Sequence, residues 1–120
     1  MAGKLTTHVL DTAQGKPAEN MAIELWSIDL ESDQRVLLKA IATNGDGRTE
    51  SPLLTDSDFK VGIYELIFVV GEYFLSQSIE TPTPPFLNRV PIQFGIANVE
   101  VHYHVPLLVS PWAYSTYRGS

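Results

Sequence analysis

The chain has 120 residues and a mass of 13.3 kDa, a length typical of one domain, and 44% of its residues are apolar, which is sufficient for a hydrophobic core. A membrane span needs about 18 apolar residues in a row, and no apolar run approaches this length. Cys is absent, which excludes disulfides, iron–sulfur clusters and Cys nucleophiles. The net charge of −6 argues against nucleic acid and anionic membranes as partners. We therefore expect one domain over residues 1–120 with neither kind of partner.

Short alternating runs of apolar and polar residues, each ended by Gly, Pro, Asn or Asp, predict antiparallel β-strands. In the first run, Leu5–Asp11, the odd-numbered residues share one face and the even-numbered residues, including His8, share the other. The runs Met21–Asp29 and Val36–Thr43 follow, separated by a polar stretch, and predict a β-hairpin. The N-terminal third of the chain is therefore expected to be entirely β.

Residues 44–47, with the sequence NGDG, predict a tight turn, because Gly and Asn tolerate positive φ and an Asp side chain can bond nearby amides. Arg48 leaves this turn at a fixed place. A loop is expected over Leu53–Lys60, a central strand over Ile63–Val70 and at most two helical turns over Gly71–Gln77.

Three of the eight Pro residues lie in Thr81–Pro85, which predicts a stiff surface crossing outside any strand or helix. The remaining predicted strands are Val90–Ile96, Val99–Val109 and Ala113–Tyr117. Seven or eight strands with one short helix favour a two-sheet sandwich, and a closed small barrel is the alternative.

Two metal sites can be considered and both are poor. Asn44, Asp46 and Glu50 resemble half a calcium loop, but Arg48 stands where a ligand oxygen is needed. The three His residues, 8, 102 and 104, could form a three-His zinc site, since residues two apart in a strand face the same side. Each His alone is more simply a solvated or hydrogen-bonded strand residue.

Three separated segments carry a family resemblance. They are LTTHVLDTAQGKPA at Leu5–Ala18, TNGDGR at Thr43–Arg48 and HYHVPLLVSPWAYSTYRGS at His102–Ser120. With YELIF at Tyr64–Phe68 and PFL at Pro85–Leu87, they closely resemble the 5-hydroxyisourate hydrolases, the transthyretin-related enzymes of urate breakdown. The terminal YRGS distinguishes these hydrolases from true transthyretins.

The resemblance implies an all-β, transthyretin-like (prealbumin-like) sandwich of about eight strands and one short helix. It also implies a homotetramer with active sites in a channel between dimers. The implied reaction is the hydrolytic opening of a cyclic amide in 5-hydroxyisourate, giving 2-oxo-4-hydroxy-4-carboxy-5-ureidoimidazoline, with no metal and no cofactor. The matching positions are His8, Arg48 and His104 as catalytic residues and Tyr117 and Ser120 as substrate-binding residues.

These residue types suit the reaction. An imidazole with a pKa of about 6.5 can remove a proton from water or return one to the leaving nitrogen, and which His does which stays open. Arg48 offers a planar fork of donors to substrate oxygens. A simpler interpretation is that Arg48 is only a surface cation and that Tyr117 only packs at a dimer edge. Asp11 faces away from His8 and is expected to be structural, and His102 to lie outside the immediate site.

A rival function is that of a non-catalytic transthyretin-like carrier, which would use the same channel to bind a small ligand. The fold cannot separate the two, but two His, one Arg and the YRGS end are not needed by a carrier. An Ig-like adhesion module is a weaker alternative because it would commonly have a disulfide and a signal peptide. Without a visible secretory segment or C-terminal SKL signal, the cytoplasm is the expected location.

Overall fold

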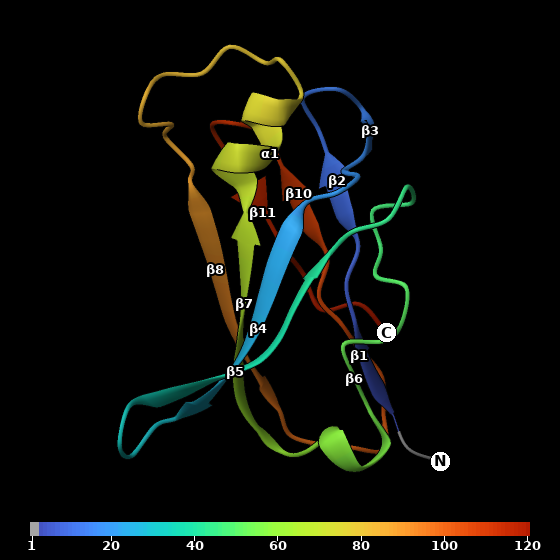
Figure 1. Ribbon diagram of the computed structural model, residues 1–120. Helices are drawn as coiled ribbons and strands as arrows, with labels where there is room; N and C mark the ends of the chain where they lie inside the picture. The colour runs from blue at the N-terminus through green and yellow to red at the C-terminus, as the bar shows by residue number, and fades with distance from the viewer. Residues whose placement is uncertain (1–2) are drawn as a thin grey trace.

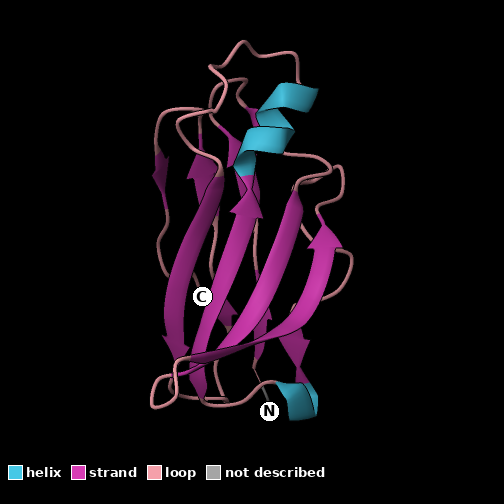
Figure 2. Ribbon diagram, turned by 60° about the vertical axis from the view of Figure 1, so that its left-hand side comes forward, coloured by secondary structure: helices cyan, strands magenta, loops and turns pink. Residues whose placement is uncertain are grey.

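The computed structural model describes residues 3–120, which form two layers of β-sheet with one short helix at one end (Figure 1, Figure 2). The first layer is an antiparallel sheet in the order β5–β4–β7–β8. Its strands are β4 (Ala22–Asp29), β5 (Gln34–Ala42), β7 (Gly62–Val69) and β8 (Arg89–Ile96). β4 and β5 form the predicted hairpin, and the apolar strand β7 lies inside the sheet as predicted.

The second layer consists of two short sheets that follow one another along the same chain segments. One has the order β6–β1–β9 and the other β11–β10–β2–β3. Their strands are β1 (Lys4–Thr6), β2 (Val9–Asp11), β3 (Lys16–Pro17), β6 (Leu54–Thr55), β9 (Tyr103–His104), β10 (Leu107–Val109) and β11 (Tyr114–Ser115). The pairs β1–β9 and β2–β10 are parallel, so segments near the two ends of the chain lie side by side.

The all-β sandwich with one short helix is confirmed, but its strands are more numerous and shorter than predicted. Pro106 has no backbone N–H to donate, and it divides the last long segment into β9 and β10. The partner segment, predicted as one strand over Leu5–Asp11, is divided opposite it. Two backbone bonds of 2.9 Å, from Val105 to the carbonyl of Thr6 and from Leu107 to that of His8, still join the two segments across the break.

Other predicted boundaries also change. The strand predicted over Val99–Val109 begins only at Tyr103, and residues 97–102 form no strand. The Tyr103 hydroxyl accepts the amides of Ala97 and Asn98 at 3.0 and 3.1 Å. The predicted loop over Leu53–Lys60 contains β6 and a 3₁₀ turn at Asp56–Asp58. The predicted helix is confirmed as α1 (Val70–Ser76).

The core lies between the two layers, and the alternation in the first segment determines what reaches it. Residues 5, 7, 9 and 11 are buried, whereas residues 6, 8 and 10 are only partly buried, which confirms the predicted division into two faces. His8 therefore lies on the outer face of the second layer. The largest fully buried side chains are Phe68, Phe74, Leu5, Met21, Ile23, Leu25, Leu53, Leu66, Ile96 and Leu107.

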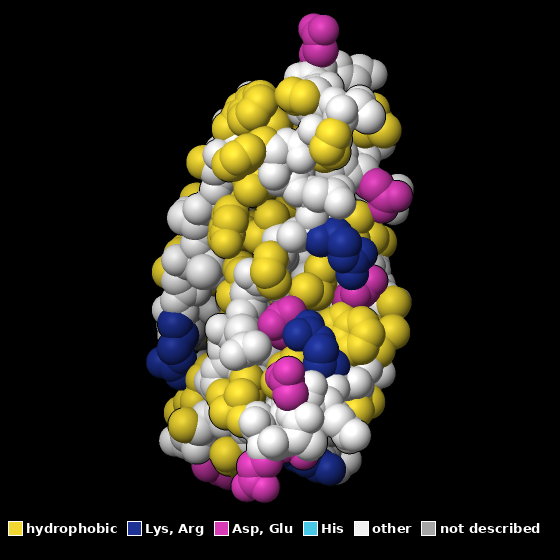
Figure 3. Space-filling model, turned by 90° about the vertical axis from the view of Figure 1, so that its left-hand side faces the viewer, with side chains coloured by type: hydrophobic (Ala, Val, Ile, Leu, Met, Phe, Trp, Pro, Cys, Tyr) yellow, Lys and Arg dark blue, Asp and Glu magenta, His cyan; other side chains and the backbone are white. Residues whose placement is uncertain are grey.

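The outer face of the first layer carries apolar side chains next to charged ones (Figure 3). Arg35 forms an ion pair of 2.5 Å with Glu65, and Arg89 one of 2.6 Å with Glu24. The Trp26 indole also donates to Glu24 at 2.9 Å. The view shows no His among the described residues, so the predicted site does not lie on this face.

Asp11 is a fully buried carboxylate, and it joins β2 to α1. It accepts the amide and the side-chain nitrogen of Gln14 at 2.9 and 2.7 Å and the Tyr73 hydroxyl at 2.8 Å. Burial and the neighbouring carboxylate raise the pKa of the Tyr73 phenol, which therefore remains a donor. The structural role predicted for Asp11 agrees with these contacts, and its partners are Gln14 and Tyr73.

We expect Tyr73→Phe to lower the free energy of unfolding by about 1–3 kcal/mol, because the buried Asp11 carboxylate loses one of its donors. Tyr64→Phe is the matched control, since Tyr64 is similarly buried but donates at 2.8 Å to the carbonyl of the exposed Lys60, which water can reach. Urea unfolding followed by circular dichroism measures both. Equal losses in the two variants would contradict the role given to the Asp11 bond.

Candidate functional site on the outer face of the second layer

His8 lies at the break between β1 and β2, and one of its ring nitrogens has a fixed partner. Its Nε2 is 2.9 Å from the backbone oxygen of Asp46. A carbonyl oxygen only accepts, so Nε2 bears the hydrogen. The unprotonated nitrogen of neutral His8 is then Nδ1, which is the atom free to take up a proton.

The turn that supplies the Asp46 carbonyl is held firmly. The tight turn is confirmed, but the side chain that accepts its amides is Asn44 and not Asp46: the Asn44 oxygen accepts the amides of Asp46 and Arg48 at 2.9 and 3.2 Å. Gly47 has a φ of 75°, and a Cβ there would lie 2.4 Å from a backbone oxygen of β2. The turn therefore packs closely against the strand, with its carbonyl at His8 and Arg48 directly after it.

His104 lies in β9 opposite Thr6 of β1, and its Nδ1 is 2.8 Å from the Thr6 hydroxyl. Burial lowers the pKa of the His104 imidazole, and the positive charges of Arg48 and His8 lower it further. All three effects favour the neutral form of the His104 ring. His8 follows Thr6 by two residues and bonds to the turn that precedes Arg48, so the three residues predicted as catalytic belong to neighbouring segments.

The C-terminal segment closes one side of His104. Gly119 forms an isolated β-bridge with His104, with backbone bonds of 2.8 and 3.4 Å in the two directions. A Cβ on Gly119 would lie 2.8 Å from Cδ2 of the His104 ring, which explains why the residue is Gly. The last residues of the chain are thus seated directly against the imidazole.

Two side chains anchor this segment. The Arg118 guanidinium lies over the Tyr103 ring at 4.5 Å and donates to the carbonyl of His102 at 3.4 Å. The Thr116 hydroxyl donates to the carbonyl of Pro106 at 2.6 Å. These roles were not predicted from the sequence, although YRGS had been singled out as a motif.

The remaining predicted residues lie near the cluster without forming it. Tyr117 is 60% exposed, and Ser120 is exposed directly after the bridge residue Gly119. His102 is exposed and lies just before β9, outside the strand that holds His104. Within one chain the candidate site is thus an open surface of half-buried and exposed polar groups.

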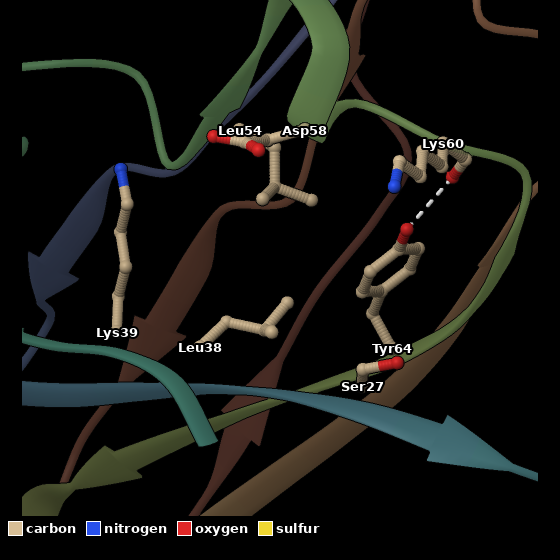
Figure 4. Close-up of a pocket in the computed structure, with 7 residues that line it drawn as sticks. All are labelled: Ser27, Leu38, Lys39, Leu54, Asp58, Lys60 and Tyr64. Atoms are coloured by element: carbon tan, nitrogen blue, oxygen red, sulfur yellow. Dashed lines mark hydrogen bonds between the residues drawn. The ribbon is translucent and has the colours of Figure 1, made fainter. Parts of the chain in front are cut away.

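A separate cleft of about 320 Å³ opens elsewhere in the fold (Figure 4). In it the Tyr64 hydroxyl donates to the backbone of Lys60, and the side chain of Leu38 points inward. The residues that line it are Ser27, Leu38, Lys39, Leu54, Asp58, Lys60 and Tyr64. None of them is a predicted site residue, so this cleft does not enter the site.

Two further tests concern metals and membranes. Among residues 3–120, no three His, Asp or Glu side chains are grouped so that they could hold a metal ion. In the same part of the chain, no helix is long and apolar enough to cross a membrane. The three-His zinc site considered from the sequence therefore finds no support in the geometry.

The two-layer sandwich is a transthyretin-like fold, and it superimposes on sea bream transthyretin with a TM-score of 0.85 and 25% identity. Residues 5–119 match the model of the HIUase/Transthyretin family, and the chain belongs to this family.

The chain is 53% identical to 5-hydroxyisourate hydrolase 2 of Rhizobium meliloti over 99% of its own length and 98% of that protein. Among solved structures, it superimposes on (S)-allantoin synthase with a TM-score of 0.93 and 50% identity, covering 99% of this chain but only 44% of that chain. It also superimposes on Klebsiella pneumoniae 5-hydroxyisourate hydrolase with a TM-score of 0.78 and 31% identity, covering 98% and 99% of the two chains.

Proposed function

We propose that this protein hydrolyses 5-hydroxyisourate to 2-oxo-4-hydroxy-4-carboxy-5-ureidoimidazoline, and that His8, Arg48 and His104 are its catalytic residues. The observation that supports the proposal is the set of contacts around His8: its ring bonds to the turn that precedes Arg48, and Thr6, two residues before it, pairs with His104. Family membership supports the same activity. Residues 1–120 act as one transthyretin-like hydrolase domain in this proposal.

The contacts of His8 give it the role of general base. Its Nε2 donates to the Asp46 carbonyl, and Nδ1 retains a lone pair while the ring is neutral. A water held at Nδ1 loses a proton as it attacks the substrate carbonyl. The carbonyl of Asp46 then stabilises the imidazolium, because it remains bonded to the protonated Nε2.

Arg48 carries the charge that the reaction needs. The attacked carbonyl becomes an oxyanion, and a guanidinium presents several N–H donors in one plane to such an oxygen. Arg48 comes directly after the fixed turn, and its charge acts on the His104 imidazole. A permanent cation near two imidazoles suits an anionic transition state.

Tyr117 and Ser120 are proposed to bind substrate from the C-terminal segment. Ser120 directly follows Gly119, which forms the β-bridge with His104. Tyr117 presents an exposed hydroxyl-bearing ring in the same segment. Both groups lie on the surface of a single chain, so a facing subunit is needed to enclose the substrate.

We propose a homotetramer, and light scattering is expected to give four times the 13.3 kDa chain mass at micromolar concentration. The aromatic side chains of Trp112, Tyr114 and Tyr117 are 58%, 45% and 60% exposed near the edge strand β11, which supports an interface there. A monomeric mass would contradict both the tetramer and the enclosed site. The cytoplasmic location stays a prediction from the sequence.

The activity is tested by generating 5-hydroxyisourate from urate with urate oxidase and following its ultraviolet decay. We expect the protein to accelerate the decay, and we expect no loss of rate in a chelator, because acid–base groups and positioning are sufficient for this hydrolysis. Decay at the uncatalysed rate, with the ligand bound but unchanged, would favour the carrier function. Loss of activity in chelator and its return with zinc would overturn the metal-free mechanism.

A further inference from the structure

The hydroxyl of Thr6 is the only group of the described residues that the structure places in hydrogen-bond contact with the His104 ring. Oγ1 lies 2.8 Å from Nδ1, and the two residues are register partners in the parallel pair β1–β9. The Thr6 carbonyl also accepts the amide of Val105 at 2.9 Å. The strand pairing and the bond from Val105 therefore fix the Thr6 hydroxyl relative to the His104 ring.

The His104 ring is held at its opposite edge as well. Gly119 lies against Cδ2, close enough that a Cβ there would collide with the ring. Nδ1 is occupied by Thr6 and Cδ2 is covered by Gly119, so Nε2 is the ring nitrogen left for chemistry. No hydrogen bond to Nε2 is formed within residues 3–120.

Whether Thr6 donates to Nδ1 or accepts from it determines which ring nitrogen of neutral His104 bears the hydrogen. A hydroxyl has one hydrogen, and in the described part of the chain Nδ1 is the only acceptor that the structure gives it. If Thr6 instead accepted a hydrogen from Nδ1, its own hydrogen would have no protein acceptor. Donation from Thr6 to Nδ1 satisfies both groups and leaves the hydrogen of the neutral ring on Nε2.

We propose that Thr6 is a positioning residue that donates to Nδ1 of His104 and so holds the ring as the Nε2–H tautomer. This inference rests on the proposed function for its catalytic meaning. His8 then presents a lone pair at Nδ1, and His104 presents an N–H at Nε2. One imidazole removes the proton from water, and the other donates to the leaving nitrogen or the developing oxyanion.

The chain offers a close control in the next residue. Thr7 carries the same hydroxyl, but it points to the core, is 2% exposed and donates to the carbonyl of Val105 at 2.7 Å. Thr7→Val therefore removes a threonine hydroxyl from the same segment without touching the His104 ring. Thr6→Val removes the bond to Nδ1 with nearly the same shape, and Thr6→Ser retains the hydroxyl.

The test combines kinetics on 5-hydroxyisourate with ¹⁵N NMR of the His104 ring in folded protein. In Thr6→Val we expect kcat to fall about tenfold with KM nearly unchanged, since loss of one neutral hydrogen bond corresponds to a factor of this size. Thr6→Ser should restore most of kcat, and Thr7→Val should leave kcat close to the unmodified value. The NMR spectrum should show a protonated Nε2 in the unmodified protein and a mixture of tautomers in Thr6→Val.

Two outcomes would overturn the proposal. One is an Nδ1-protonated His104 in the unmodified protein, and the other is an unchanged tautomer and kcat in Thr6→Val. The NMR measurement needs no substrate, so it remains decisive even if the protein does not hydrolyse 5-hydroxyisourate. Inactive unmodified protein with the expected tautomer would instead count against the proposed function alone.

Discussion

His104→Ala is expected to lower kcat on 5-hydroxyisourate by about 10² or more, because proton transfer in the transition state loses its carrier. His102→Ala is the matched comparison two residues away. Its imidazole is exposed and lies before β9, and only its backbone carbonyl contacts the C-terminal segment. That carbonyl is retained in the alanine variant, so His102→Ala should remain within a few-fold of the unmodified rate.

Both variants are measured on freshly generated substrate, with circular dichroism to confirm folding and light scattering to confirm that the oligomeric state matches that of the unmodified protein. A reversed result, with His102→Ala inactive and His104→Ala active, would show that the two positions have been exchanged. Full activity in both variants would contradict the acid–base mechanism. His8→Ala, measured in parallel, should resemble His104→Ala because the base at Nδ1 is removed.

Arg48→Lys is expected to reduce kcat/KM by about 10² to 10³, the effect of losing a well-placed donor to an oxyanion. Lysine keeps the positive charge but replaces a planar fork with a single ammonium group. Arg48→Gln removes the charge as well and should be at least as impaired. The pair of variants therefore separates donor geometry from charge.

The pKa of His104 gives a second readout for the same pair. Burial is the main cause of the lowered pKa of His104, and the positive charge of Arg48 lowers it further. Removing the charge in Arg48→Gln should move the His104 pKa upward, whereas Arg48→Lys should leave it lowered. NMR titration of the ring measures this directly. An unchanged pKa in Arg48→Gln would mean that the guanidinium does not lie near the imidazole.

Local patterns were sufficient to predict much of the fold. The β4–β5 hairpin, the internal strand β7, the helix α1 and the turn before Arg48 all follow from alternation, apolar runs or turn residues. The strand alternation also placed His8 on one face with Thr6 and Leu10, although it did not indicate that this face is the outer one. These features depend on residues close in sequence, which is why a single sequence could indicate them.

The remaining features depend on contacts between distant segments. The parallel pairings of β1 with β9 and of β2 with β10 join the two ends of the chain. The Thr6 bond to His104 spans 98 residues. The resemblance pointed to the site residues, but it did not indicate the hydrogen bonds that orient them.

The parallel pairing of the two end segments also bears on how the protein acquires its activity. A bond that spans 98 residues, between Thr6 and His104, forms only after the intervening chain is in place. Contacts of such high sequence separation are slow to form because the loop must close before they give stability. A refolding chain should thus gain sheet structure before it gains catalysis, and recovery of hydrolysis would report the final closure of the sandwich.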